Sequence, residues 1–320
     1  MKKIGLALSG GGIRAAIFHL GVLKCLAENR QLSKIASIST VSGASLVVAA
    51  IFAIFGDKWP SSSEYIKTLP AIRDMILHKN LQTSALAHLF LLPRYWRNRV
   101  QILAHVLEEK WGICGNMQDL PSRPFWEINC TTFETGGNFR FRRDYMGDAK
   151  IGYVRRPALP ISHVIAASAA FPVLIGPYIL ETEKLKFTDA KRGGQRVNVA
   201  PRYSLWDGGV YDNMGLSALY KNGQLDKEID FLIVSNASQA LHPQKRRGNI
   251  SPANLRRLLD ISQNQVNVIN EERVINDIVK RGQGFYVKIG IEYPTTLRAP
   301  APQDFDMLFD HGYEMANASI

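Results

Sequence analysis

The sequence predicts an α/β fold built on a mainly parallel central sheet. Length and composition indicate a folded protein with a sizeable core, and the order of the first elements indicates the fold class. The chain of 320 residues is long enough to bury a sizeable core. Its composition, with 46% apolar and 21% charged residues, is ordinary for a folded protein. Its first 55 residues alternate between strand-like and helix-like segments, which is the order typical of α/β domains.

The first four elements follow one another closely. An apolar run at residues 3–9 predicts a buried strand, and apolar residues at helical spacing predict a helix over residues 13–27. Residues 35–41 predict a second strand, and residues 42–55 predict a second helix. A glycine loop joins the first strand to its helix, and a sharp turn joins the second strand to its helix. Two strand–helix units in succession indicate parallel strands.

The rest of the chain predicts further strands and helices within one domain that covers residues 1–320. Residues 57–123, where proline, tryptophan and basic residues cluster, are interpreted as a helical insertion that could form a lid or a membrane-facing region. Residues 125–133 and 138–145 predict a hairpin, because the Glu-Thr-Gly-Gly between them is a turn signal. The other predicted elements are a short helix at 161–170, an exposed loop or hairpin at 184–204, strands at 229–234 and 284–289, and helices at 251–280 and 303–320.

The chain is strongly basic, with a formal net charge of +11. Such a charge favours anionic partners, namely nucleic acid, an anionic membrane surface or acidic substrates, and charge alone does not choose among them. Residues 89–99 combine an apolar run with two aromatic residues and with Arg94, Arg97 and Arg99. This composition suits an anchor on anionic lipid, and it equally suits a core helix with a solvated basic end. The basic groups at residues 140–143, 245–247 and 256–257 are interpreted as solvated faces.

Cysteine usage and hydropathy indicate the compartment. Three widely spaced cysteines without a Cys-x-x-Cys pair argue against a disulfide framework and favour a reducing compartment. The apolar run at residues 4–8 is shorter than the core of a signal peptide, and the apolar run at residues 46–55 is too short to span a bilayer. We therefore expect a cytoplasmic protein that is peripheral to the membrane, without a signal peptide or a transmembrane helix.

The glycine run Gly10, Gly11 and Gly12 lies between the first predicted strand and helix. Glycine tolerates the backbone angles that point several N–H groups into one small volume, and a helix N-terminus adds positive potential there. Such a loop can hold a phosphate or a developing oxyanion. The Gly-Lys-Ser/Thr ending of a P-loop is absent, and the dinucleotide fingerprint is only approximated. A tight turn without any ligand is the alternative.

Ser42 lies on the predicted sharp turn between strand and helix, as the serine of a nucleophile elbow does. Small neighbours such as Gly43 let the helix pass close by, although Thr40 and Ala44 stand where the usual pattern has glycine. Serine is also a common helix N-cap, which is the alternative role for Ser42. Further along, Asp207 opens the sequence Asp-Gly-Gly, which is a turn signal and also places a carboxylate where it could act as a base.

Four short blocks in this order resemble the patatin-like phospholipase family, in particular its bacterial-type serine lipid acyl hydrolases. They are residues 7–15, residues 39–45, residues 166–172 and the Asp-Gly-Gly at 207–209. The resemblance implies a three-layer α/β/α sandwich with a mainly parallel sheet. It also implies a catalytic pair without histidine, in which Ser42 is the nucleophile and Asp207 is the base.

The same resemblance assigns the remaining site residues. The backbone N–H groups of Gly10, Gly11 and Gly12 would form the oxyanion hole. Supporting roles fall to Arg14, which would stabilise the loop or a lipid phosphate, and to the glycines Gly43, Gly208 and Gly209. The seven histidines are scattered without a His-Glu-x-x-His motif, and no calcium-loop signature occurs. We therefore expect catalysis without a metal or another cofactor.

The leading hypothesis is a serine hydrolase of phospholipid or lysophospholipid acyl esters, acting at an anionic membrane surface. An acyltransferase that uses the same acyl-enzyme chemistry is an alternative, and nothing in the sequence separates the two. A lipid-binding relative without catalysis would not need the complete set of motif residues. A nucleic-acid-binding protein is also considered, but no zinc finger, RRM or helix-turn-helix pattern occurs, so no nucleic acid is expected as a partner. The oligomeric state stays open.

Overall fold

The computed structural model describes residues 2–91, 98–172, 175–189, 194–243 and 251–320. Five parallel strands form the centre of its sheet, in the order β14-β13-β1-β2-β3. Their bounds are β1 Ile4–Leu8, β2 Ile35–Thr40, β3 Phe125–Thr132, β13 Phe231–Asn236 and β14 Gly284–Lys288. β1 and β13 are buried along their whole length, because helices cover both faces of this part of the sheet.

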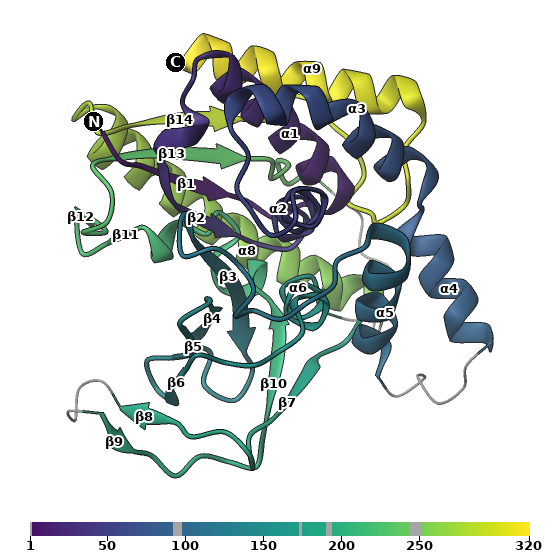
Figure 1. Cartoon of the computed structure of the whole chain (residues 1–320), viewed down its shortest axis with the longest axis vertical. Coiled ribbons are helices and arrows are strands. Elements are labelled where there is room, and N and C mark those ends of the chain that lie inside the picture. The colour runs from purple at the N-terminus through teal and green to yellow at the C-terminus, as the bar shows by residue number, and fades with distance from the viewer. Residues whose placement is uncertain (1, 92–97, 173–174, 190–193, 244–250) are drawn as a thin grey trace.

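Antiparallel strands extend the sheet beyond β3. β3 pairs with β4, and β5, β6, β8 and β9 follow in that order, while β10 pairs with both β3 and β7. Their bounds are β4 Asn138–Phe141, β5 Tyr145–Asp148, β6 Gly152–Arg155, β7 Tyr178–Glu181, β8 Thr188–Asp189, β9 Gln195–Arg196 and β10 Arg202–Asp207. A separate hairpin joins β11, Tyr220–Lys221, to β12, Gln224–Leu225. Strands β4 to β10 lie below the parallel centre in Figure 1, and the β11–β12 hairpin lies at its left.

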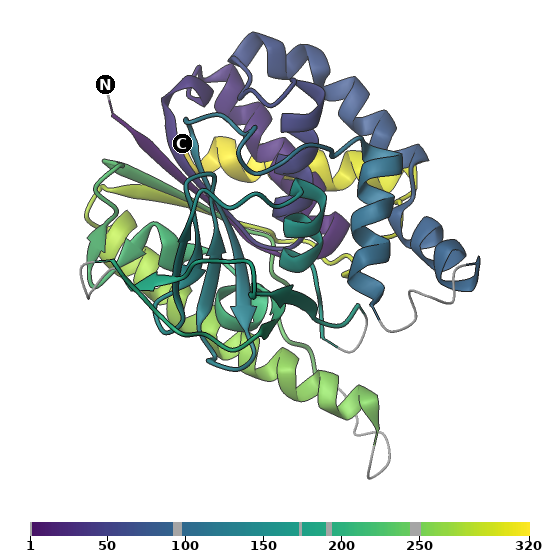
Figure 2. The same cartoon turned by 60° about the horizontal axis from the view of Figure 1, so that its bottom comes forward.

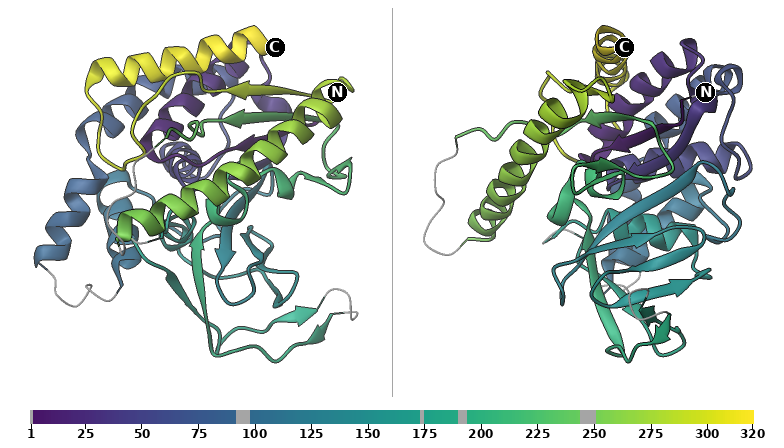
Figure 3. Two further views of the ribbon diagram at one scale, coloured as in Figure 1. Left: turned by 180° about the vertical axis from the view of Figure 1, so that it is seen from behind. Right: turned by 90° about the vertical axis from the view of Figure 1, so that its left-hand side faces the viewer.

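Helices form a layer on each side of the parallel strands. Figure 2 shows α1, α3 and α9 on one side and α8 on the other, and Figure 3 shows α8 crossing the back of the sheet. The bounds are α1 Gly12–Glu28, α2 Gly43–Ile54, α3 Ser62–His78, α8 Pro252–Arg273 and α9 Pro302–Ser319, and a π-helical turn at Val274–Val279 continues α8. Gly21 and Gly312 allow α1 and α9 to cross closely. A Cβ at either glycine would collide with the backbone of the other helix.

Three further helices lie near the carboxyl ends of the parallel strands. They are α4 Leu81–Leu91, α5 Arg99–Trp111 and α6 Ile161–Ser168, and Figure 1 shows α4 and α5 side by side at the edge of the molecule. A short helix, α7, covers Gly209–Asp212 directly after β10. None of the described helices combines the length and the apolar character needed to cross a membrane.

The predicted α/β fold, with a mainly parallel central sheet between helices, is confirmed. Two predicted elements are wrong in detail. The strand expected over residues 138–145 is two strands, because Arg142 and Asp144 pair across a turn at 142–144 and the chain reverses there. The exposed segment expected at 184–204 extends too far, because its last residues belong to β10, where Tyr203 and Leu205 point into the core. Strands β6 and β7 were not predicted.

Candidate active site

Ser42 and Asp207 are brought together by β3, because β2 and β10 end on it from opposite directions. β2 pairs in parallel with the first half of β3, and its last residue, Thr40, lies opposite Ile128. β10 pairs antiparallel with the second half of β3, and its last residue, Asp207, lies opposite Cys130. The carboxyl ends of two strands far apart in the sequence therefore meet at neighbouring positions of a third strand.

Ser42 is the residue of the sharp turn between β2 and α2. Its backbone has φ 52° and ψ −115°, a conformation that non-glycine residues rarely adopt. Ser42 stands at the N-cap position of α2, as the alternative expected, but its side chain makes no cap hydrogen bond there. The backbone N–H of Ser42 donates to Ser168 Oγ at 3.1 Å. The turn is held in a strained geometry that turns the hydroxyl away from its own helix.

Asp207 is 3% exposed. The Gly209 N–H donates a hydrogen bond to Asp207 Oδ1 at 2.8 Å. Burial raises the pKa of Asp207 to about 6, against the lowering effect of the Gly209 N–H and of the Ser42 hydroxyl beside the carboxylate. A carboxylate with a pKa near 6 is a better proton acceptor than an exposed aspartate, and it is still ionised at neutral pH.

The backbone of the glycine loop lies in direct contact with the backbone of the turn at Ser42. Gly11 has φ 147° and Gly12 has φ 64°, both in the region that favours glycine. A Cβ at Gly43 would collide with the carbonyl oxygen of Gly12. At Gly208, a Cβ would lie 2.5 Å from the Asn129 carbonyl oxygen. Glycines at these positions therefore permit the close packing of the three motifs.

The backbone N–H groups of the glycine loop differ in whether they already have a hydrogen-bond acceptor. The Gly10 N–H donates to the Asn213 carbonyl at 3.0 Å, and the Ile13 N–H donates to the Thr296 carbonyl at 2.8 Å. Gly11 and Gly12 lie at the cap and first position of α1, where the helix itself offers their N–H groups no acceptor. The loop amides suited to an oxyanion are therefore those of Gly11 and Gly12. The N–H of Gly10 is already bonded to the Asn213 carbonyl, so Gly10 contributes by fixing the position of the loop.

Arg14, two residues after the glycine loop, bonds to segments in the C-terminal part of the chain. It is 2% exposed, and its guanidinium donates to the Ala237 carbonyl at 3.1 Å, the Tyr293 carbonyl at 2.5 Å and Thr295 Oγ1 at 3.0 Å. Burial lowers its pKa to about 10, so the side chain is still a cation at neutral pH. Of the two roles expected for Arg14, these contacts are those of a residue that stabilises the loop.

A buried hydroxyl network explains why Thr40 stands at the elbow. Thr40 Oγ1 accepts hydrogen bonds from Trp126 Nε1 and from Ser45 Oγ, both at 2.9 Å. Ser45 Oγ also lies 2.9 Å from Ser168 Oγ, which donates to the Asn129 carbonyl at 2.8 Å. Threonine at this position is therefore part of the support of the turn. Ser168 lies in the third motif block, whereas no local pattern in the sequence distinguishes Asn129.

Ser42 and Asp207 open onto a pocket with a volume of about 750 Å³. One wall is largely apolar, and the other carries polar and charged side chains of α8. The apolar wall includes Ala85, Leu86, Leu89, Ile102, Leu103, Phe171, Ile175 and Leu297. The polar wall includes Arg256, Arg257, Asp260, Gln263, Asn264 and Asn267. The pocket is therefore suited to a ligand with one apolar and one polar end.

The histidines do not complete a triad in the part of the chain that the structure describes. His19 is fully buried between Ser235 Oγ and the Ser9 carbonyl, both at 2.9 Å, and burial lowers its pKa to about 4. His242 lines the pocket and pairs with Glu292 at 2.8 Å. Neither Ser42 nor Asp207 receives a hydrogen bond from a histidine among the described residues.

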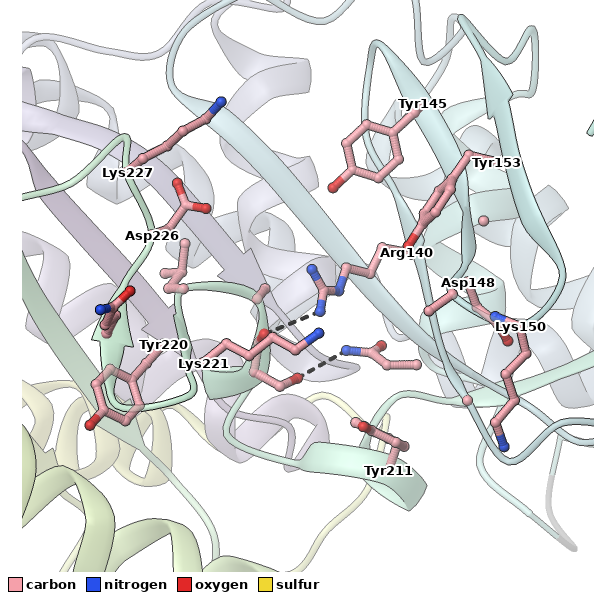
Figure 4. Close-up of a pocket in the computed structure, with 18 of the residues that line it drawn as sticks. Arg140, Tyr145, Asp148, Lys150, Tyr153, Tyr211, Tyr220, Lys221, Asp226 and Lys227 are labelled. Atoms are coloured by element: carbon pink, nitrogen blue, oxygen red, sulfur yellow. Dashed lines mark hydrogen bonds between the residues drawn. The ribbon is translucent and has the colours of Figure 1, made fainter. Parts of the chain in front are cut away.

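A second pocket, with a volume of about 620 Å³, lies apart from these residues. Figure 4 shows Arg140, Tyr145 and Tyr153 on one side of it and Lys221 extending from the other. None of the predicted site residues lines this pocket. Parts of the two predicted basic segments, namely residues 92–97 with Arg94 and Arg97, and residues 245–247, lie outside the described residues.

Comparison with models of known families identifies one family. A family model described as "Patatin-like phospholipase" matches residues 6–220. The chain is similar to the structure of human GIVD cytosolic phospholipase A2, with a TM-score of 0.50 and 14% identity over 73% of this chain and 45% of that chain. It is also similar to VipD from Legionella pneumophila, with a TM-score of 0.47 and 16% identity over 99% of this chain and 66% of that chain. This chain thus spans less than half of the human protein. Comparison with curated protein sequences finds no match.

Proposed function

Because the chain belongs to the patatin-like phospholipase family, we propose that it is a serine hydrolase of phospholipid or lysophospholipid acyl esters. The family predicted by resemblance is thereby confirmed. One observation carries the finer proposal: the strained Ser42 and the buried Asp207, whose pKa is about 6 and is lowered by the Ser42 hydroxyl beside it, line the same pocket. The pair supplies a nucleophile and a base.

Acylation begins when Ser42 Oγ attacks the carbonyl carbon of the ester and its proton passes to Asp207. The carbonyl oxygen becomes an oxyanion, for which the N–H groups of Gly11, Gly12 and Gly43, at the N-termini of α1 and α2, are the candidate donors. The helix N-termini add positive potential at the same place. Asp207 then gives its proton to the departing alcohol oxygen, leaving the acyl group on Ser42.

Deacylation repeats these steps with water. Asp207 accepts a proton from the water molecule as the water oxygen attacks the acyl carbon. The oxyanion forms again and collapses, the bond to Ser42 Oγ breaks, and the proton on Asp207 returns to Ser42. The products are a fatty acid and the free serine hydroxyl, so the enzyme is regenerated.

The two walls of the pocket support a lipid as the substrate. An acyl chain would lie along the apolar wall, to which α4 and α5 contribute, and its burial there contributes about 0.8 kcal/mol per CH₂. A polar head group would face α8, where Arg256 and Arg257 offer cations to a phosphate. The net charge of +11 would attract the protein to an anionic membrane surface, which we propose as its site of action.

The proposal is tested by fatty-acid release from vesicles of phosphatidylcholine with and without phosphatidylglycerol. We expect release by the native protein, faster on the anionic vesicles, and none above background by Ser42→Ala or Asp207→Ala. Ser63→Ala, at an exposed position of α3, is the matched control and should retain full activity. A fluorophosphonate probe should label the native protein and the control but not Ser42→Ala. Equal release by all four proteins would refute the assignment.

A further inference from the structure

Three potential metal ligands lie together on α4 and α5, outside the active-site pocket. His88 lies on α4, and His105 and Glu109 lie one turn apart on α5. One ligand atom of each residue lies within 4.8 Å of the ligand atoms of the other two. The rings of His88 and His105 meet edge to face, with centroids 5.2 Å apart. Two separate helices therefore contribute to one group of donors.

A hydrogen bond at Nδ1 of His88 leaves the Nε2 of the neutral ring able to bind a metal ion. Its Nδ1 lies 2.8 Å from the Ser84 carbonyl oxygen, which can only accept, so Nδ1 carries the proton. In the neutral ring, Nε2 then has a lone pair, and it faces Glu109 Oε2 at 3.4 Å. A backbone carbonyl on the other ring nitrogen is the support that metal-bound histidines commonly have.

A lone pair that faces a carboxylate oxygen is repelled unless a cation lies between them. One candidate is a proton on Nε2, which would make an ordinary ion pair. The other is a metal ion. For tetrahedral Zn²⁺, bonds of about 2.0–2.1 Å to nitrogen and about 2.0–2.2 Å to oxygen place the two donor atoms about 3.4 Å apart. The distance between His88 and Glu109 already has this value.

We propose that His88, His105 and Glu109 form a zinc site that joins α4 to α5. Two imidazoles and one carboxylate are ligands that suit Zn²⁺, and water would take the fourth position on the exposed side. Mg²⁺, which prefers oxygen donors, does not fit this set.

The position of the site defines its role. Neither histidine lines the active-site pocket, whereas Leu89, next to His88, and Ile102, near His105, both do. An ion at this site fixes the two helices that carry the apolar wall, without touching Ser42 or Asp207. The site is thus structural, and its binding does not depend on the proposed hydrolase activity.

Zinc binding is measured by titrating the metal-free 320-residue chain with Zn²⁺ in a calorimeter. We expect binding of one ion per chain, and His105→Ala and Glu109→Gln should weaken it by more than the roughly 10–100-fold that loss of an outer-shell partner brings. Both residues are exposed, so the variants should fold, which thermal unfolding without metal verifies. Zn²⁺ should also raise the unfolding temperature of the native protein, and Mg²⁺ should do neither.

His78→Ala is the matched control. His78 also bonds the carbonyl four residues before it, that of Asp74, and pairs with the Asp74 carboxylate at 2.9 Å, but within a single helix. This variant should bind Zn²⁺ as the native protein does. The proposal is overturned if the native protein binds no Zn²⁺, or if His78→Ala weakens binding as much as His105→Ala.

Discussion

Gly43 packs against the backbone of Gly12, so that the turn of Ser42 and the glycine loop are in direct contact. A Cβ at Gly43 would overlap the carbonyl oxygen of Gly12. The contact brings together the first residues of α1 and α2, which belong to separate strand–helix units. The shape of the candidate oxyanion hole therefore depends on the absence of one methyl group.

Gly43→Ala should remove activity while Ser42 and Asp207 are intact. The added methyl group forces the two loops apart and misaligns the donors, and loss of one such donor typically costs roughly 10²–10³ in rate. Steady-state hydrolysis of a short-chain ester measures the effect as kcat/KM. Gly290→Ala is the control, because its Cβ would meet His311 at an ordinary 3.4 Å. An active Gly43→Ala variant would contradict the role given to this contact.

The activity should depend on the ionisation of Asp207. Its pKa is about 6, and only the carboxylate can accept the proton of Ser42. kcat/KM should therefore be level above about pH 7 and fall about tenfold for each pH unit below about 6. A soluble ester is the suitable substrate, because its binding does not change with vesicle charge. A profile that is flat down to about pH 4.5 would exclude Asp207 as the base.

Asp207→Asn should stabilise the protein at neutral pH. A carboxyl with a pKa of about 6 when folded and about 3.9 when unfolded destabilises the ionised folded state by roughly 3 kcal/mol. This destabilisation is complete above about pH 6, and it disappears as the pH falls below about 4, where the carboxyl is protonated in both states. Urea unfolding should show the variant as more stable at about pH 7.5 and similar to the native protein at about pH 4. Equal stability at both pH values would contradict the raised pKa.

Ser42→Gly should be more stable than Ser42→Ala, although both lack the nucleophile. Glycine adopts φ 52° and ψ −115° without strain, whereas alanine retains the strained Cβ. After the greater flexibility of glycine in the unfolded chain is subtracted, we expect a difference of about 1 kcal/mol in the free energy of unfolding. Urea unfolding of both variants measures it. A more stable alanine variant would show that the turn is not strained.

The sequence predicted the parts of the site that are local, and it missed those that depend on distant contacts. Ser42 and the glycine loop follow predicted strands directly, so short motifs were sufficient to find them. The start of strand β10 was assigned to a charged segment, because Arg202 and Ser204 point outward and its partners on β3 lie more than 70 residues earlier. The meeting of β2 and β10 on β3 could therefore not be derived from spacing. The same is true of Asn129, whose side chain bonds Ser39 and Thr40.

The contacts of Arg14 link the glycine loop to the folding of the C-terminal part of the chain. Its acceptors include the Tyr293 carbonyl and Thr295, and the nearby Ile13 N–H bonds the Thr296 carbonyl, all near the C-terminal end. A chain shortened to residue 220 would contain Ser42 and Asp207, but the glycine loop would lack these braces, and β1 would lack its neighbour β13. The arrangement of the glycine loop is thus complete only when the last part of the chain has folded. On the proposed function, a partly synthesised or clipped protein would lack a complete oxyanion hole.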